Sequence, residues 1–330
     1  MDKEYIDCDF CGRDDTDLVF EVYSEVTGRR EKFNIVRCRN CDLCYVNPRL
    51  PKEIILKYYP EDNYYSYKCF EDCKKISFKK VKEIAIEFIG NYPKISSGKG
   101  LIDLLGKLIA LMVKNSISVV IPYKEDANVL DIGCGSGELL FFLKKHGFNT
   151  YGVEISNKAA NYGNKYGLNI LNCDFADTNF PSDFFDIIVI NQVLEHLYSP
   201  YKTLKGINRI IKKDGLLILG VPNIDSYGMK VYKSYSSILD IPRHLYHFST
   251  STLKKMLLKS GFKIEKIVSK NFFIPHYNKY SLSLLKKECA FFRLFKAYLQ
   301  IYLLKPIFFT FSRNKESFGE FITIYAYKGK

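Results

Sequence analysis

The sequence predicts an α/β fold preceded by a small metal-binding segment, and three observations lead to that class. From residue 128 onward, short apolar runs alternate with amphipathic stretches, a pattern typical of a parallel sheet covered by helices. A glycine-rich loop lies where the first apolar run meets the first amphipathic stretch. Two C-x2-C pairs lie within the first 50 residues.

The alternating region predicts a regular series of elements. Strands are expected at 128–132, 149–154, 168–172, 184–190 and 215–221, and helices at 138–145, 157–166, 200–211 and 249–260. Two last strands are expected at 262–268 and 320–327. The chain therefore divides into a metal-binding ribbon at 1–50, a helical linker or cap at 51–127, and an α/β domain at 128–330 with an insertion at 270–317.

The cysteine pairs have the spacing of a zinc ribbon. Cys8 and Cys11 form one pair, and Cys38 and Cys41 form the other, with strand-like runs between them that predict a hairpin. Each pair can bring two thiolates to one side of a tight turn, and two such turns complete a tetrahedral Zn²⁺ site. The site has no open position, so we expect the zinc to be structural. Cys44 repeats the spacing and is an alternative to Cys41.

Residues 130–140 read LDIGCGSGELL, with Gly133, Gly135 and Gly137 at alternate positions behind Asp131. Because glycine costs conformational entropy, three of them at a strand–helix junction indicate backbone that passes close to a ligand. The spacing differs from the G-x-G-x-x-G of dinucleotide-binding proteins, and the segment lacks the Gly-Lys-Ser/Thr end of a P-loop. The pattern D-x-G-x-G-x-G resembles that of class I S-adenosylmethionine (SAM)-dependent methyltransferases.

This resemblance implies a Rossmann-like class I methyltransferase sheet with SAM at the carboxyl ends of its strands. Asp131 would hold the methionyl ammonium, and Glu154 would accept hydrogen bonds from both ribose hydroxyls. Asp174 would accept a hydrogen bond from the adenine amino group, with Phe175 alongside the adenine ring. The alternatives are a strand end in solvent for Glu154 and a helix N-cap for Asp174. The expected SAM-contacting residues are Asp131, Gly133, Cys134, Gly135, Gly137, Glu154, Ile155, Asp174, Phe175 and Asn191.

Histidines follow the fourth and fifth predicted strands. His196 lies in NQVLEHL, and His244 and His247 lie in IPRHLYHFST. If the methyl acceptor is a hydroxyl, a general base helps to remove its proton, and these three histidines are the expected catalytic residues. Arg243 would hold a phosphate or carboxylate of the acceptor. The alternatives are a structural hydrogen bond for His196 and a loop packed on the sheet, with one histidine capping the helix at Ser249.

Other short segments of the sequence resemble particular groups of methyltransferases. A cysteine knuckle followed by YVNPRL, together with PRHLYHFS, is similar to bacterial sugar and surface-polysaccharide methyltransferases. The implied activity is O-methylation of a sugar, a nucleotide-sugar or a lipid-linked saccharide. The LEH of residues 194–196 resembles ubiquinone-pathway O-methyltransferases, so a quinone-pathway acceptor is an alternative. Some of those enzymes hold a divalent metal there, but only Glu195 and His196 match its ligands, and no catalytic metal is predicted.

The formal net charge of +13 raises a second alternative, an RNA methyltransferase. Only 10 of the 49 basic residues are arginine, the residue best suited to bidentate phosphate and base contacts. No Asn-Pro-Pro-Tyr follows the fourth strand, and no Pro-Cys pair occurs in the sequence. We therefore expect a small-molecule acceptor rather than a nucleic acid.

The sequence opens without a secretory signal and has no uncharged run of 18 apolar residues, which predicts a cytoplasmic protein. In the insertion, Phe292, Phe295, Leu299, Tyr302 and Leu303 share a helical face that Pro306 should terminate. We expect this segment to close over the acceptor. The alternatives are a homodimer contact and peripheral contact with the inner face of the membrane. The stretch 100–115 predicts another amphipathic helix, packed on the catalytic domain or lying on a membrane.

Overall fold

The computed structural model of the chain forms two compact units. The structure describes residues 3–24, 30–59, 83, 85–93, 117, 119–270, 275–288, 291–304 and 318–329. Unit 1 comprises Met1–Pro60, Gln192–Lys205 and Val221–Ile324, and unit 2 comprises Glu61–Asn191, Gly206–Gly220 and Tyr325–Lys330. The helix expected at 100–115 lies outside the described residues.

Unit 2 contains the strands of the predicted parallel sheet. They are β4 (Asn128–Ile132), β5 (Asn149–Val153), β6 (Ile170–Leu171), β7 (Phe185–Asn191) and most of β8 (Ile211–Pro222). β4 pairs in parallel with both β5 and β7, β5 pairs with β6, and β7 pairs with β8. The residues of β7 from Phe185 to Ile190 are all buried, as expected for a strand covered on both faces.

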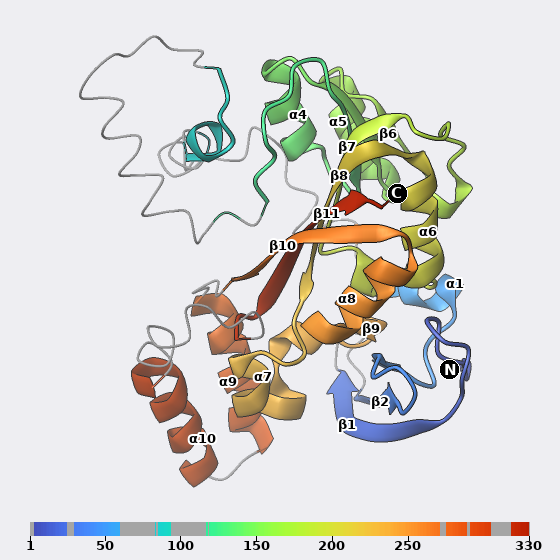
Figure 1. Ribbon diagram of the computed structural model, residues 1–330. Helices are drawn as coiled ribbons and strands as arrows, with labels where there is room; N and C mark the ends of the chain where they lie inside the picture. The colour runs from blue at the N-terminus through green and yellow to red at the C-terminus, as the bar shows by residue number, and fades with distance from the viewer. Residues whose placement is uncertain are drawn as a thin grey trace, which may run out of the picture. The chain divides into compact units, whose positions relative to one another are not determined.

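The described strands of the larger sheet run in the order β10-β11-β8-β7-β4-β5-β6. Figure 1 labels five of them, β6, β7, β8, β10 and β11. β10 (Phe262–Lys270) lies in unit 1, and β8 and β11 (Phe321–Lys328) each run from one unit into the other. The helices between the strands are α4 (Glu138–Lys145), α5 (Asn157–Lys165), α6 (Pro200–Ile210) and α8 (Thr250–Lys259). The Rossmann-like methyltransferase fold predicted from the sequence is confirmed, and the last strand, β11, lies beside β8.

A buried carboxylate joins three segments of unit 2. The Asp186 side chain at the start of β7 accepts hydrogen bonds from Lys124 Nζ, Lys212 Nζ and the Asn128 N–H at the start of β4. Burial by itself raises the pKa of Asp186, but these hydrogen bonds outweigh burial and hold the pKa at about 2. Asp186 therefore stabilises the folded protein in its ionised form.

We predict that Asp186→Asn lowers the free energy of unfolding by about 1–3 kcal/mol at pH 7, because two lysines and an amide lose their carboxylate acceptor. A folded pKa below the ordinary value of 3.8 means that the stabilisation is full above about pH 4 and is lost as the pH falls through the folded value. Urea unfolding at pH 7 and pH 3 tests this. Asp183→Asn, which removes an exposed partner of Lys328, is the control and should cost little. If Asp186→Asn lowers the free energy of unfolding equally at pH 7 and pH 3, Asp186 does not stabilise the protein as an ionised carboxylate.

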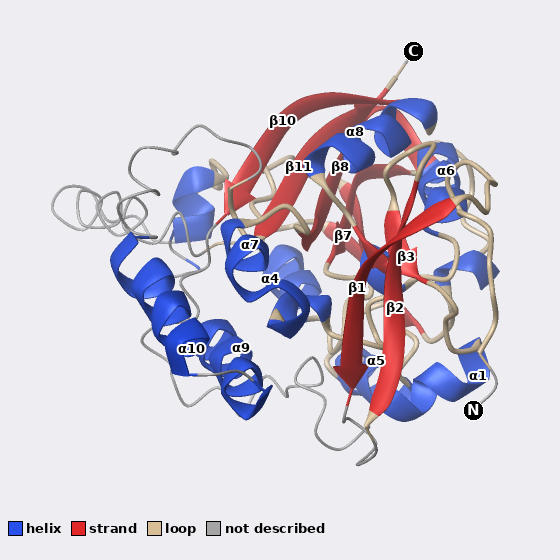
Figure 2. Cartoon of the chain, turned by 90° about the horizontal axis from the view of Figure 1, so that it is seen from below, coloured by secondary structure: helices blue, strands red, loops and turns tan. Residues whose placement is uncertain are grey.

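Unit 1 contains a second sheet, in the order β1-β2-β3-β9. β1 (Thr16–Ser24) and β2 (Glu31–Cys38) form the predicted antiparallel hairpin, and β3 (Cys44–Val46) pairs with the other side of β2 (Figure 2). β9 (Tyr246–His247) then pairs with β3, with Cys44 opposite His247 and Tyr45 opposite Tyr246. The cysteine ribbon and the histidine segment therefore belong to one sheet.

Unit 1 contains further α-helices among the described residues. They are α1 (Lys52–Ile55), α7 (Tyr227–Tyr232), α9 (Pro275–Glu288) and α10 (Phe291–Tyr298), the last of which continues as a π-helix over Leu299–Leu304. Among the described helices, none is both long and apolar enough to span a bilayer.

The insertion contains helices, as the sequence predicts. α9 and α10 lie side by side (Figure 2), and Ala297 and Ile301 pack with Leu282, Leu285 and Tyr232. On the predicted apolar face, Phe295 and Leu299 are 58% and 39% exposed, and the side chains of Phe292, Tyr302 and Leu303 lie outside the described residues. The sequence shows that a helix here is amphipathic, but the position of its neighbours decides which apolar residues are buried.

Candidate functional site

The glycine loop of unit 2 has a backbone conformation that requires glycine. Gly133, Gly135 and Gly137 have φ angles of +71°, +55° and +83°, a region that side chains disfavour. Gly137 directly precedes α4, and a Cβ atom there would lie 2.4 Å from the Leu168 Cδ1 atom. The loop therefore turns sharply from β4 into α4 and leaves backbone close to the end of the sheet.

Glu154, at the end of β5, holds this loop in place. Its Oε2 accepts the Gly135 N–H at 2.8 Å, and its Oε1 accepts the Ser156 N–H at 2.9 Å. Ser156 in turn caps α5 by accepting the Ala159 N–H. The predicted alternative for Glu154, a strand end in solvent, is wrong, because the residue is 7% exposed.

Asp131 and Glu154 form a buried acidic pair that fits a cationic ligand. Each is 7% exposed, and burial followed by the charge of Glu154 raises the pKa of Asp131 to about 8. Burial also raises the pKa of Glu154. SAM carries an ammonium and a sulfonium, and a positive ligand offsets the cost of two buried carboxylates.

The remaining predicted SAM residues lie at neighbouring strand ends of unit 2. Asp174 Oδ1 accepts the Ala176 N–H at 3.1 Å and caps the short 3-10 helix Phe175–Asp177, so the capping alternative is confirmed. Ile155, after β5, is 51% exposed. Asn191 ends β7, and its Oδ1 would lie 2.2 Å from a Cβ atom at Gly220, which explains the glycine in β8.

Two residues that support this region were not identified from the sequence. Asn172 Nδ2 donates to the backbone oxygens of Glu154 and Ile155 at 2.9 and 3.0 Å. Gly152 leaves space for Cys134, whose Sγ would lie 2.7 Å from an added Cβ atom. An isolated glycine within a predicted strand was the available signal for Gly152. Asn172 gave no such signal.

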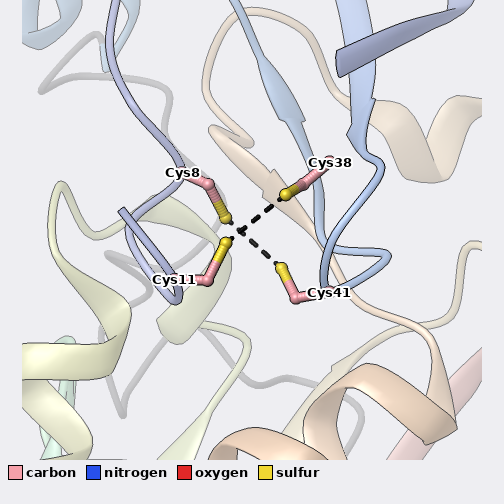
Figure 3. Close-up of side chains that lie close together, drawn as sticks. All are labelled: Cys8, Cys11, Cys38 and Cys41. Carbon is pink, nitrogen blue, oxygen red and sulfur yellow. Dashed lines mark hydrogen bonds between the residues drawn. The ribbon is translucent and has the colours of Figure 1, made fainter. Parts of the chain in front are cut away.

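Four cysteines of unit 1 converge as the spacing predicts (Figure 3). Cys8 Sγ lies 3.4 Å from Cys41 Sγ, and Cys11 Sγ lies 3.5 Å from Cys38 Sγ. Thiolates bound tetrahedrally to Zn²⁺ at about 2.3 Å lie roughly 3.8 Å apart, so the four sulfurs fit a zinc ion. Cys44 lies in β3 outside the cluster, which makes Cys41 the fourth member.

The two cysteine turns have the same backbone pattern. The Gly12 N–H donates to Cys8 O at 2.7 Å, and the Asp42 N–H donates to Cys38 O at 2.9 Å. Both donors have positive φ angles, +71° for Gly12 and +68° for Asp42. Each turn therefore projects its two sulfurs to one side, as a zinc knuckle requires.

A second convergent cluster in unit 1 contains Glu195, His196 and His244. One potential ligand atom of each lies within 4.8 Å of the others. Glu195 and His196 lie in the 3-10 turn Leu194–His196, directly after β7 in the chain, and His244 lies in the loop before β9. The Leu245 N–H donates to Glu195 O at 2.8 Å and joins the two loops.

Burial keeps the histidines of this region uncharged. It lowers the pKa of His196 to about 3, of His244 to about 4 and of His247 to about 3. Burial also raises the pKa of Glu195, which is 1% exposed, to about 8. Ser249 caps α8 with its own hydroxyl, so the prediction that a histidine caps this helix is wrong.

Arg243 is paired within its own loop. Its Nε and Nη2 atoms donate to Asp240 Oδ1, and its carbonyl oxygen accepts from His196 Nδ1 at 3.0 Å. Asp240 has a φ angle of +39° at the turn before Arg243. Arg243 therefore fixes the loop that carries His244, and the sequence could not show that its charge was paired.

Comparison with known proteins agrees with the geometry of unit 2. Residues 105–267 match the family model described as "Methyltransferase domain". The chain contains a class I SAM-dependent methyltransferase domain. It is 28% identical over 153 residues to an uncharacterized protein of Methanocaldococcus jannaschii, covering 46% of this chain and 73% of that protein.

Two further similarities are weaker, one because it covers less of the related protein and the other because its sequence identity is lower. This chain is 35% identical over 102 residues to a ubiquinone biosynthesis O-methyltransferase of Coxiella burnetii. The match covers 29% of this chain and 44% of that enzyme. A chain in the complex between the Haloferax volcanii Trm112 methyltransferase activator and a putative methyltransferase is 19% identical, with a TM-score of 0.45 and coverage of 63% and 85%. The match therefore spans less than half of the Coxiella enzyme.

We predict that Glu154→Ala weakens SAM binding by about 2–4 kcal/mol, because Gly135 loses the contact that holds the loop and the ribose hydroxyls would lose the acceptor that the methyltransferase resemblance assigns to them. Calorimetric titration with SAM and with S-adenosylhomocysteine measures the effect. Asp177→Ala, an exposed acid one turn beyond Asp174, is the control and should bind normally. Unchanged affinity in Glu154→Ala would place SAM elsewhere.

Proposed function

We propose that this protein transfers the methyl group of SAM to a hydroxyl oxygen of a small molecule, with a sugar, a nucleotide-sugar or a lipid-linked saccharide as the acceptor. The observation that carries the proposal is a group of three neighbouring, uncharged imidazoles, the half-buried His196 and the buried His244 and His247, in a chain with a SAM-dependent methyltransferase domain. Neutral imidazoles can bind a hydroxyl and accept its proton.

The chemistry assigns these side chains a definite task. In the transfer, the carbon–sulfur bond of SAM breaks, the acceptor oxygen bonds to the methyl carbon, and S-adenosylhomocysteine leaves. The hydroxyl proton must also depart, and a neutral histidine nitrogen has the lone pair that can accept it. His196 is the most exposed of the three, and its ring lies 4.6 Å from that of His244. Holding the acceptor oxygen in line with the sulfonium supplies much of the rate.

Two features support a saccharide acceptor. The converged cysteine ribbon and the β9 segment PRHLYHFS, which carry the similarity to sugar and polysaccharide methyltransferases, form one sheet in unit 1. Zinc held by Cys8, Cys11, Cys38 and Cys41 would have a structural role there, because all four positions of the site are filled by sulfur.

A quinone-pathway phenol is the second candidate acceptor. It is favoured by the 35% identity to the Coxiella burnetii ubiquinone biosynthesis O-methyltransferase. A phenol is also a stronger acid than a sugar hydroxyl and needs less help to lose its proton.

Incubation with methyl-labelled SAM and an acceptor panel tests the proposal. The panel contains nucleotide-sugars, lipid-linked saccharides, polyprenyl catechols and total RNA. We expect label in a saccharide, on oxygen, as shown by mass spectrometry of the product. Label in the catechol would support the second candidate, and label in RNA would contradict both.

A further inference from the structure

We propose that Glu195, His196 and His244 bind a divalent transition-metal ion in unit 1, at a site separate from the four-cysteine cluster. One ligand atom from each residue lies within 4.8 Å of the others. The binding inference depends on these residues alone. The role that we give the ion, which is to bind the acceptor oxygen, rests on the proposed function.

The first observation is a buried carboxyl group with unused oxygens. Glu195 is 1% exposed, and neither Oε1 nor Oε2 has a hydrogen-bond partner among the residues that the structure describes. Buried polar atoms are nearly always paired, and unpaired ones in native proteins indicate a missing water or ion. An ion bound to Glu195 would satisfy both the charge and the lone pairs.

The second observation is the tautomer of His244. His244 Nδ1 lies 2.9 Å from Ile238 O, and His196 Nδ1 lies 3.0 Å from Arg243 O. Because a carbonyl oxygen only accepts hydrogen bonds, His244 Nδ1 carries the proton, which leaves a lone pair on its Nε2. His196 Nδ1 also lies 2.9 Å from the Tyr59 hydroxyl, which can donate to it, so its tautomer follows the orientation of that hydroxyl. Histidines that bind metals typically donate their other ring N–H to a carbonyl or carboxylate in this way.

The third observation is the spacing around His244. Its Nε2 lies 4.0 Å from Glu195 Oε1 and 3.7 Å from Asp240 Oδ2, too far for a hydrogen bond to either. Atoms bound to one ion at about 2.1 Å lie roughly 3–3.5 Å apart at ordinary coordination angles, so an ion would draw these side chains together by roughly 1 Å. The separation of His244 Nε2 from Glu195 Oε1 therefore exceeds that of two ligands of one ion by only about 0.5–1 Å.

The loops that carry the ligands are already fixed. The Leu245 N–H bond to Glu195 O joins them, and the His244 N–H donates to Asp240 O at 3.1 Å. Tyr59 Oη lies 2.9 Å from His196 Nδ1 and holds the ring from a third segment. Ligand positions set in advance reduce the ordering cost of metal binding.

The ligand set defines the class of ion. Two imidazoles and one carboxylate suit Zn²⁺, Mn²⁺, Fe²⁺ or Co²⁺, whereas Mg²⁺ and Ca²⁺ prefer oxygen ligands throughout. Three protein ligands leave positions open, in contrast to the four-sulfur site. Such an ion would lower the pKa of a bound hydroxyl, which suits a reaction that must remove the acceptor proton.

Cobalt titration of the full-length protein, purified with its ribbon zinc, tests the site. We expect one additional Co²⁺ per chain, with visible d–d absorption and without the near-ultraviolet thiolate charge-transfer band that a cysteine site would give. Glu195→Gln and His244→Gln should lose this Co²⁺. His146→Gln is the matched control, since His146 is a buried histidine of unit 2 outside the cluster, and it should keep the ion.

Thermal unfolding separates loss of the site from loss of the fold. Saturating Co²⁺ should raise the melting temperature of the wild type by about 4–10 °C and leave that of Glu195→Gln unchanged. Glu195→Gln keeps the shape of the side chain, so without metal it should melt no lower than the wild type. A wild type that gains no Co²⁺, or equal Co²⁺ uptake by Glu195→Gln, would overturn the proposal. Co²⁺ uptake and melting temperature are measured without any turnover. A negative result would therefore count against the metal site and would leave the proposed methyl transfer untouched.

Discussion

Replacing His244 with glutamine is expected to lower the rate of methyl transfer by about 10²–10⁴-fold and to leave SAM affinity unchanged. His244 lies in the cluster of unit 1 beside Glu195 and His196, and the SAM residues lie in unit 2. The substitution removes the lone pair on Nε2, whether it accepts the acceptor proton or binds an ion that holds the acceptor oxygen. Glutamine can still donate to the Ile238 carbonyl from its amide, which limits damage to the loop.

The measurement is single-turnover methyl transfer from labelled SAM, with calorimetric SAM binding as the companion readout. His196→Gln should fall by a similar factor, because both rings contribute to the same cluster. His146→Gln, whose ring bonds the Phe142 carbonyl and Glu87 in unit 2, is the control and should turn over at nearly the wild-type rate. Wild-type turnover in both cluster variants would remove the catalytic role of the histidines.

Replacing Cys8 with serine is expected to release one zinc ion per chain and to unfold the ribbon. Structural zinc sites contribute roughly 10–16 kcal/mol of binding free energy, and a hairpin of this size buries too little apolar surface to fold alone. The loss should extend to β9, because β3 holds it by pairing Cys44 with His247. Methyl transfer should therefore fall together with zinc, although Cys8 is not part of the histidine cluster.

Metal analysis and amide hydrogen exchange measure the two effects. Amides of β2, β3 and β9 should lose protection in Cys8→Ser, and those of β4 in unit 2 should keep it. Cys44→Ser is the matched control, since Cys44 is a buried cysteine outside the four-sulfur cluster, and it should retain one zinc. Full zinc content in Cys8→Ser, or its loss in Cys44→Ser, would show that the ligands are misassigned.

The features that sequence predicted well are local ones. β4 and α4 occupy the expected residues because an apolar run, three glycines and an amphipathic stretch follow one another without a gap. The glycines could be assigned to a turn because only a residue without a side chain adopts φ angles such as +83° at Gly137 readily. The cysteine pairs were equally local, since each knuckle is a turn of a few residues.

The features that sequence missed depend on contacts between distant segments. Glu195 and His196 were visible as a pair, but their partner His244 lies in a loop brought there by the Leu245–Glu195 hydrogen bond. From the sequence, Arg243 was expected to contact the methyl acceptor. Its pairing with Asp240 depends on the positive φ angle of Asp240, which the sequence does not show. The choice between Cys41 and Cys44 likewise depended on where β3 begins.

Calorimetric titration with SAM and, separately, with NAD tests the central claim of this account most directly. The buried pair Asp131 and Glu154 and the three left-handed glycines of unit 2 predict that one SAM binds per chain, and that the titration with NAD releases no heat of binding. Tight binding of NAD together with absence of SAM binding would contradict the account, because the glycine loop would then hold a dinucleotide and not a methyl donor.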